Sequence, residues 1–325
     1  MSETSSAGIT NHCQKYSLEH TVDKLEHNCA IHWVGPRSSS PESKVLLYVH
    51  GGGYATPIAQ PQISMPMSLV SHIRGPVSLA FLEYSLTIDA KFPTPLIQII
   101  ICLSHLLATY PPSQIILGGE SSGGHLILAL LSFLSHPNPA IFSPSPTLKE
   151  PLAGVFILSP LVNRSIGADS YTRNADRDFP DVSKIEAQRA TWAPPADMDI
   201  PRGFLDPLYA DEGWWSNAPV KRVLITTGMW ETMQDDCVAF GERWKEEQKG
   251  LDIRTVQCPF EVHASCIVEE AFGLSGVDGG SRKVTEAWLE DRGLHGVVHA
   301  TGSCTHTINN SNTFKLIYHH QYEAY

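Results

Sequence analysis

The sequence predicts an α/β fold in which a mostly parallel sheet is covered by helices on both faces. Short β-branched or apolar runs alternate with segments of helix length along most of the chain. Strands that alternate with helices in this way form parallel sheets whose two faces are both buried. The chain has 325 residues, 42% of them hydrophobic and 18% charged, which suits one large globular domain and is too apolar for disorder.

Each expected element follows from its own run of residues. β-Branched or apolar runs predict strands at 44–49, 77–83, 114–117, 154–158, 222–226 and 253–258. Longer buried or amphipathic segments predict helices at 95–110, 126–134, 236–248 and 283–291, and the first of these opens with a proline.

Two segments lie outside this alternation. Residues 163–220 are rich in Asp, Pro and Trp, which indicates either a lid-like, substrate-facing insertion or a plain surface excursion. Residues 293–325 are rich in His, Thr and Asn and show no core pattern. We therefore expect one domain over 1–292, with an N-terminal segment at 1–43, followed by a C-terminal tail outside the core.

Charge and composition exclude several classes of function. The chain has 34 acidic against 23 basic residues and a formal net charge of -11, which disfavours nucleic acid as a partner. The seven cysteines are scattered and odd in number, which indicates reduced thiols in an intracellular compartment rather than a disulfide framework or a metal site. The N-terminus lacks an apolar signal-peptide core, and the longest apolar stretch, 95–107, is too short for a transmembrane segment. We expect a cytoplasmic protein, and no sequence feature specifies its oligomeric state.

The strongest motif is Gly119-Glu120-Ser121-Ser122-Gly123, a G-x-S-x-G that directly follows an expected strand and precedes an expected helix. A serine on such a sharp turn has strained backbone angles, and small flanking residues keep the turn from colliding with strand and helix. The turn lifts the hydroxyl clear of the sheet, beside the positive end of the helix. This pattern indicates a nucleophile elbow with Ser121 as the nucleophile. Ser122 is the alternative nucleophile, but Ser121 has one glycine two positions before it and another two positions after it.

A second motif, His50-Gly51-Gly52-Gly53-Tyr54, follows the strand at 44–49. A run of glycines lets backbone N–H groups approach a substrate oxygen without obstruction, so Gly51 and Gly52, together with the N–H of Ser122, are candidates for an oxyanion hole. The alternative is a flexible turn. His50 is expected to position the oxyanion loop.

These motifs, with Glu83-Tyr84-Ser85-Leu86 and Phe92-Pro93 between them, resemble the hormone-sensitive-lipase-like branch of the α/β-hydrolase family from about residue 44 to about 291. The resemblance implies an α/β-hydrolase fold, no cofactor, and esters of short acyl groups such as acetyl on a hydrophobic alcohol. The chain departs from the branch where Glu120 and Ser122 replace its usual aspartate and alanine. The glycine-rich and Trp-containing variant further resembles fungal esterases, including those of secondary-metabolite pathways.

The acid of a catalytic triad is expected after the strand at 222–226, in the chain order serine, acid, histidine. Glu231 occupies that position in the chain order, and Asp235 is the alternative candidate for the triad acid. Asp206 opens a segment, DPLYADE, that resembles the branch's acid motif but lies before the strand, so it is a decoy. The alternative for Glu231 is an acidic residue in the first turn of a helix.

His263, after the strand at 253–258, stands where the resemblance places the catalytic histidine. A histidine suits proton shuttling because its pKa lies near neutrality. His125, by contrast, is expected to be a core residue or a neighbour of the site. Trp214, Trp215 and Trp230 either line the substrate pocket or pack in the core; the residues do not distinguish these two roles.

The expected function is hydrolysis of a carboxylic ester through an acyl-enzyme, with Ser121, His263 and Glu231 as the triad and a small-molecule ester as the partner. Two alternatives use the same scaffold. One is a ligand-binding module, since the plant gibberellin receptor resembles this branch but has lost the histidine. The other is a non-hydrolytic step, such as acyl transfer or cyclisation.

Overall fold

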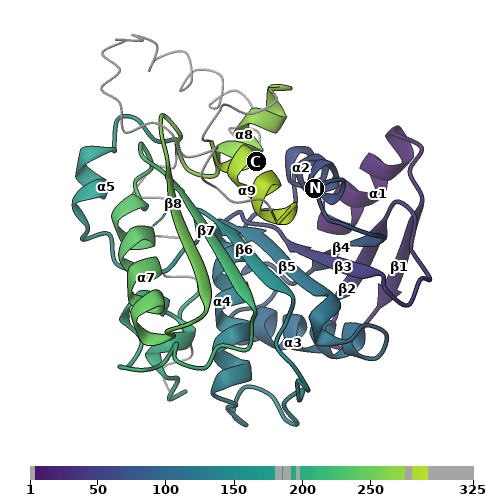
Figure 1. Ribbon diagram of the computed structural model, residues 1–325, viewed down its shortest axis with the longest axis horizontal. Helices are drawn as coiled ribbons and strands as arrows, with labels where there is room; N and C mark the ends of the chain where they lie inside the picture. Colours follow the sequence, from purple (N-terminus) through teal and green to yellow (C-terminus); the bar gives the residue numbers. More distant parts are fainter. Residues whose placement is uncertain (1–3, 180–184, 186–191, 195–197, 275–279, 292–325) are drawn as a thin grey trace.

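A computed structural model describes residues 4–179, 185, 192–194, 198–274 and 280–291. Their centre is an eight-stranded sheet of order β1-β2-β4-β3-β5-β6-β7-β8 (Figure 1). β1 pairs with β2, and β2 with β4, in antiparallel fashion, whereas all later neighbours are parallel. The mostly parallel α/β sheet that the sequence predicts is therefore confirmed.

The strands occupy short runs of the chain. They are β1 His20–Lys24, β2 Ala30–Val34, β3 Lys44–Val49, β4 Val77–Glu83, β5 Ile115–Glu120, β6 Gly154–Leu158, β7 Arg222–Gly228 and β8 Asp252–Cys258. The parallel strands β3, β5 and β6 are almost wholly buried, as expected of strands that are covered on both faces.

Helices cover the two faces of the sheet in separate groups. α3 Thr94–Leu107, α4 Ser121–Ser135 and α7 Gln234–Glu247 contribute to one hydrophobic core. α1 Ser5–Lys15, α2 Gln60–Val70, α8 Ser265–Ala271 and α9 Ser281–Leu289 contribute to the core on the other face (Figure 1). The remaining described helices are short: α5 Asp169–Arg173, and the 3-10 turns η1 Pro112–Gln114, η2 Arg202–Phe204 and η3 Pro207–Tyr209.

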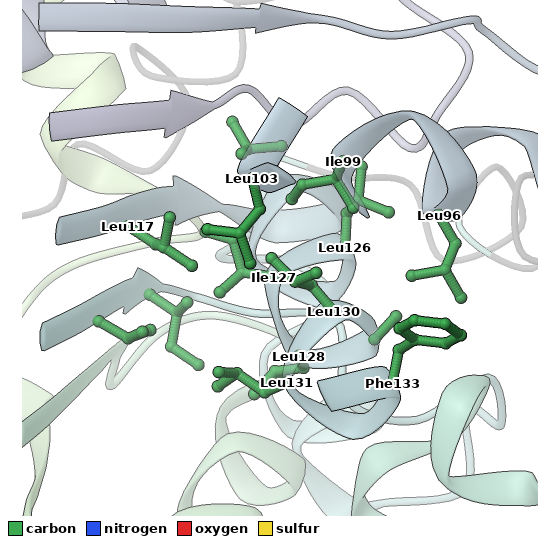
Figure 2. Packing of buried hydrophobic residues seen from close by; sticks show 14 of the residues in the cluster. Leu96, Ile99, Leu103, Leu117, Leu126, Ile127, Leu128, Leu130, Leu131 and Phe133 are labelled. Carbon is green, nitrogen blue, oxygen red and sulfur yellow. The ribbon is translucent and has the colours of Figure 1, made fainter. Parts of the chain in front are cut away.

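α4 is the central helix of the first core. Figure 2 shows Leu126, Ile127 and Leu130 of this helix packed between α3 and the sheet. Twelve of its residues are buried, so the helix is held by packing on several sides rather than by one amphipathic face. The start of α4, which carries Ser121, is thereby fixed relative to the strands.

The expected strands and the four expected helices are all present, with ends that differ by a few residues. The helix after the G-x-S-x-G motif begins at Ser121 itself, because β5 runs directly into it without a loop. The N-terminal segment 1–43 contains α1, β1 and β2, which the sequence patterns did not predict: α1 and β1 are polar, and β2 is an apolar run of only five residues. Parts of the segment 163–220, and the tail 293–325 with its histidines, lie outside the described residues. Of the helices that are described, none is both long and apolar enough to cross a bilayer.

Candidate active site

Four neighbouring strands end side by side at one edge of the sheet. β5, β6, β7 and β8 are parallel to one another, so their carboxyl ends meet there. Ser121 follows β5, Ser159 follows β6, Glu231 follows β7 and His263 follows β8. Crevices outside the carboxyl ends of parallel strands are where α/β proteins bind ligands. The topology therefore brings four residues that lie far apart in the sequence to one edge.

Ser121 lies at the start of α4 with a φ of 53°, the left-handed conformation that a non-glycine residue adopts only under constraint. A Cβ on Gly123 would lie 2.1 Å from the carbonyl oxygen of Val49, and one on Gly119 would lie 2.7 Å from the same oxygen. Both flanking glycines are thus required because the turn packs directly on the end of β3. The expected strand–turn–helix elbow is present.

The two serines of the elbow have different surroundings. Ser121 is half-buried, whereas Ser122 is fully buried. The Oγ of Ser122 accepts a hydrogen bond of 3.2 Å from the backbone N–H of Tyr54. Ser122 therefore anchors the glycine loop to α4, and Ser121 is the more accessible of the two serines.

The glycine loop differs from its expected role at one position. The backbone N–H of Gly51 donates to Oε1 of Glu120 at 2.5 Å, so it is engaged inside the protein. The expectation that Gly51 supplies an oxyanion donor is therefore wrong. No hydrogen bond of the Gly52 or Gly53 N–H is found among the described residues. Gly53, which the sequence reasoning did not select, thus joins Gly52 as a candidate donor.

The side chain of Glu120 anchors this glycine loop through the N–H of Gly51. Its carboxylate also accepts hydrogen bonds from the Tyr48 hydroxyl and, at 2.5 Å, from the side-chain amide of Gln62. Burial raises the pKa of Glu120 to about 7, and these donors oppose that rise. His50 is buried beside the loop, and its Nδ1 lies 2.7 Å from the carbonyl oxygen of Gly51. Burial lowers the pKa of His50 to about 4, so a neutral imidazole helps to position the loop.

Glu231 is fully buried directly after β7. Its Oε2 accepts hydrogen bonds from Ser159 Oγ at 2.5 Å and from the N–H of Gly228 at 3.1 Å, while Oε1 accepts one from Thr227 Oγ1 at 2.7 Å. Burial first, and the negative charge of Asp178 second, raise the pKa of Glu231 to about 8. The donors fix the orientation of the carboxyl group.

The other two acidic candidates lie elsewhere. Asp235 forms an ion pair of 2.6 Å with Arg173 and is 37% exposed. Asp206, the decoy, is buried in an ion pair of 3.0 Å with Arg164. Each of these two carboxylates thus pairs with an arginine, whereas Glu231 Oε2 lies 3.9 Å from His263 Nδ1.

His263 lies in the loop between β8 and α8 and is 6% exposed. Its backbone N–H donates to Asp178 Oδ1 at 2.9 Å, and the next N–H, that of Ala264, donates to Ser159 Oγ at 3.0 Å. Ser159 therefore joins the loop that carries Glu231 to the loop that carries His263. The separation of 3.9 Å between imidazole and carboxylate is longer than a hydrogen bond.

Aromatic residues surround the site unequally. Trp192 is 1% exposed and stacks on Tyr54 with 3.8 Å between ring centroids, next to the glycine loop. His125 lies 2.5 Å from the Tyr54 hydroxyl and is fully buried, in agreement with its expected place beside the site. Trp230 lies half-buried against Phe260, at the ends of β7 and β8.

Trp214 and Trp215 have a structural role. Trp214 donates to Ser132 near the end of α4, and Trp215 packs against Phe240 and Trp244 of α7. Ser132 lies near the end of α4 that is remote from Ser121, and Trp244 lies near the C-terminal end of α7. Of the two roles left open by the sequence, core packing is therefore the one that the contacts support. No local sequence signal selects Trp192, because the ring on which it stacks, Tyr54, lies far away in the chain.

In the described ranges, no group of three or more His, Cys, Asp or Glu side chains is arranged to hold a metal ion. The edge of the sheet presents a hydroxyl on a strained turn, a histidine, a buried carboxyl group and backbone N–H donors.

Comparisons with known proteins agree with this geometry. The family described as alpha/beta hydrolase fold matches residues 46–266. An acetyl-hydrolase from Streptomyces hygroscopicus is 25% identical over 214 residues, which cover 65% of this chain. The same match covers 64% of the relative, so the chain spans a little under two thirds of that protein's length.

Solved structures share the architecture at low identity. Carboxyl esterase 2 from the mycorrhizal fungus Tuber melanosporum has a TM-score of 0.69 at 16% identity, covering 86% of this chain and 88% of that one. An esterase from the bacterial hormone-sensitive lipase family has a TM-score of 0.66 at 22% identity, covering 90% and 93%. These likenesses show the fold. With the family match over most of the chain, they establish that this protein belongs to the α/β-hydrolase fold family.

Proposed function

We propose that the protein is a carboxylic ester hydrolase of the hormone-sensitive-lipase-like branch, with Ser121 as nucleophile, His263 as general base and Glu231 as the acid of the triad. The observation that carries this proposal is the strained φ of 53° at Ser121, on a turn that leads straight into a buried helix. A strained serine at this point of an α/β sheet is the geometry of a nucleophile elbow.

The reaction follows from the residues at the edge of the sheet. Ser121 Oγ attacks the ester carbonyl carbon while His263 takes the hydroxyl proton, and the carbonyl oxygen becomes an oxyanion. The N–H groups of Gly52, Gly53 and Ser122 receive that charge. His263 then gives the proton to the leaving alcohol, and water releases the acid from the acyl-enzyme by the same steps. Glu231 stabilises the charged imidazole.

The substrate that we propose is an ester of a short acyl group on an apolar alcohol. The Streptomyces relative is named an acetyl-hydrolase, and this name supports a small acyl group. The apolar alcohol stays a prediction from the sequence resemblance, since Trp192 and Tyr54, which stack next to the glycine loop, are each only 1% exposed. A place in a secondary-metabolite pathway stays a prediction from the sequence resemblance.

The test is a series of p-nitrophenyl esters of increasing acyl length, with Ser121→Ala as the matched control. We expect turnover that is highest for the acetyl and propionyl esters and that falls by at least about 10³-fold in the variant. Analysis of the products with an added alcohol acceptor separates hydrolysis from acyl transfer, because only hydrolysis releases the free acid. Turnover that survives in Ser121→Ala would contradict the proposed mechanism.

A further inference from the structure

Three polar residues recur at intervals of four in the chain that leaves β6. Ser170 lies in α5, and Asn174 and Asp178 follow it. The backbone continues the helical pattern, since the N–H of Asn174 donates to Ser170 O and that of Asp178 donates to Asn174 O, each at 3.0 Å. Side chains four apart share one face of a helical segment. All three are buried, at 0%, 0% and 2% exposure.

This polar face lies against the backbone of the loop that carries Glu231. Ser170 Oγ donates to the carbonyl oxygen of Thr232 at 2.6 Å, and Asn174 Nδ2 donates to that of Glu231 at 2.8 Å. Asp178 Oδ2 accepts from both the N–H and the Oγ1 of Thr232, at 2.7 and 3.0 Å. The segment 170–178 is thus hydrogen-bonded to the loop at the peptide groups of Glu231 and Thr232 and at the hydroxyl of Thr232.

Asp178 also reaches the second catalytic loop. Its Oδ1 accepts from the N–H of His263 at 2.9 Å and from the N–H of Phe179 at 3.0 Å. Four donors therefore meet one carboxylate, and a side chain with acceptors alone is what such a cluster requires. Because one of its oxygens bonds Thr232 and the other bonds His263, a single side chain sets the spacing between the two loops.

The electrostatics argue against a role for Asp178 in packing alone. Burial raises the pKa of Asp178 to about 6, although its four hydrogen bonds lower it. The negative charge of Asp178 in turn raises the pKa of the neighbouring Glu231. A second buried carboxyl group beside the acid of a triad is unfavourable unless it supplies something else, and the geometry shows what it supplies.

We propose that Ser170, Asn174 and Asp178 form a positioning clamp that holds Glu231 within reach of His263, with Asp178 as its decisive member. This inference rests on the proposed function. Asp178 is a positioning residue because it contacts the backbone of His263 and Thr232 and not the reacting atoms. A misplacement of about 1 Å in a catalytic group can cost about 10²-fold in rate, so the clamp should act on turnover and not on substrate binding.

The test compares Asp178→Asn with Asp169→Asn, an exposed aspartate in the same segment. With p-nitrophenyl acetate we expect kcat of Asp178→Asn to fall about 10- to 100-fold while KM stays within about threefold. Labelling of Ser121 by a fluorophosphonate should slow in proportion. Asp169→Asn should match the wild type in all three measurements.

The pH profile supplies a readout that loss of packing alone does not move. Among the described residues, the titratable groups that face Glu231 are Asp178, His263, Cys237 and Cys258. Removal of the charge of Asp178 lowers the pKa of Glu231, so the acid limb of kcat/KM should move to lower pH in Asp178→Asn. A folded Asp178→Asn with wild-type kcat and an unmoved limb would overturn the inference.

A milder variant decides the matter if Asp178→Asn does not fold. Ser170→Ala removes one hydroxyl from the clamp and leaves both carboxyl groups in place. We expect kcat to fall about three- to tenfold at constant KM, and wild-type kcat would overturn the inference. A wild-type protein that neither labels nor turns over esters would overturn the proposed function itself, and this inference with it.

Discussion

At the scale of single residues, the decisive property of the site is the burial of Glu231. Desolvation disfavours the carboxylate, and the three donors Ser159, Thr227 and Gly228 compensate only in part, so the pKa rises to about 8. A triad acid must be ionised to stabilise the imidazolium of His263. The active form of the site is therefore the one in which Glu231 is ionised, and this form prevails at higher pH.

This burial predicts an alkaline profile. As pH rises from about 6.5 to about 8.5, a growing fraction of Glu231 ionises, so kcat/KM should rise over that interval. Glu231→Gln should lower kcat by about 10⁴-fold, as expected for loss of a triad acid, and should remove the dependence on this group. Initial rates with p-nitrophenyl acetate across the pH range provide the measurement. The control is Asp235→Asn, which should keep the wild-type profile, and an equal loss in both variants would contradict the assignment.

At the scale of elements, α4 links the core to the chemistry. Its first residue is Ser121, and its buried face packs between α3 and the sheet (Figure 2). The strain at Ser121 is maintained because the rest of the helix is fixed by packing. The element therefore serves both as the largest packed helix of its face and as the support of the nucleophile.

This role predicts a separable effect on stability. Leu130 is fully buried in α4, and Leu130→Ala should lower the free energy of unfolding by about 2–5 kcal/mol. Leu134→Ala, at a half-buried position of the same helix, should cost less. Urea denaturation followed by circular dichroism measures both. Equal losses in the two variants would show that burial within α4 does not determine the contribution of a side chain to stability.

The elements differ in how well their roles could be predicted from the sequence. Ser121 could be selected because strand, turn and helix are contiguous in the chain. The engagement of Gly51 could not, because its partner Glu120 lies 69 residues away and approaches only when β3 and β5 pair. Asp178 was missed for the same reason, since its partners Thr232 and His263 lie 54 and 85 residues further along the chain. Local patterns predict elements and motifs, whereas the supports of a site depend on which strands become neighbours.

At the scale of the whole molecule, several buried carboxyl groups make stability depend on pH. Burial raises the pKa of Glu120 and Glu261 to about 7, of Glu231 to about 8 and of Asp178 to about 6. Each group binds its proton more tightly in the folded than in the unfolded chain. The stabilisation is complete below the unfolded pKa and is lost as pH rises through the folded one.

His50 has the opposite effect on the pH dependence of stability, but only at acidic pH. Burial lowers the pKa of His50 to about 4, so that group favours folding as pH rises toward its unfolded value of about 6.5 and adds nothing above it. We therefore expect the free energy of unfolding to fall between about pH 6.5 and about pH 8. Thermal unfolding at a series of pH values measures this, and Glu261→Gln should reduce the slope. A Tm that rises over the interval would contradict the raised pKa values of these buried carboxyl groups.

The most direct test of the central claim, that Ser121 is an activated nucleophile, is labelling with a fluorophosphonate followed by peptide mass spectrometry. The measurement requires no knowledge of the substrate. The account predicts a single adduct on Ser121 that is absent in His263→Ala and strongly slowed in Glu231→Gln. A folded wild-type protein without an adduct, or with an adduct on Ser122, would contradict it.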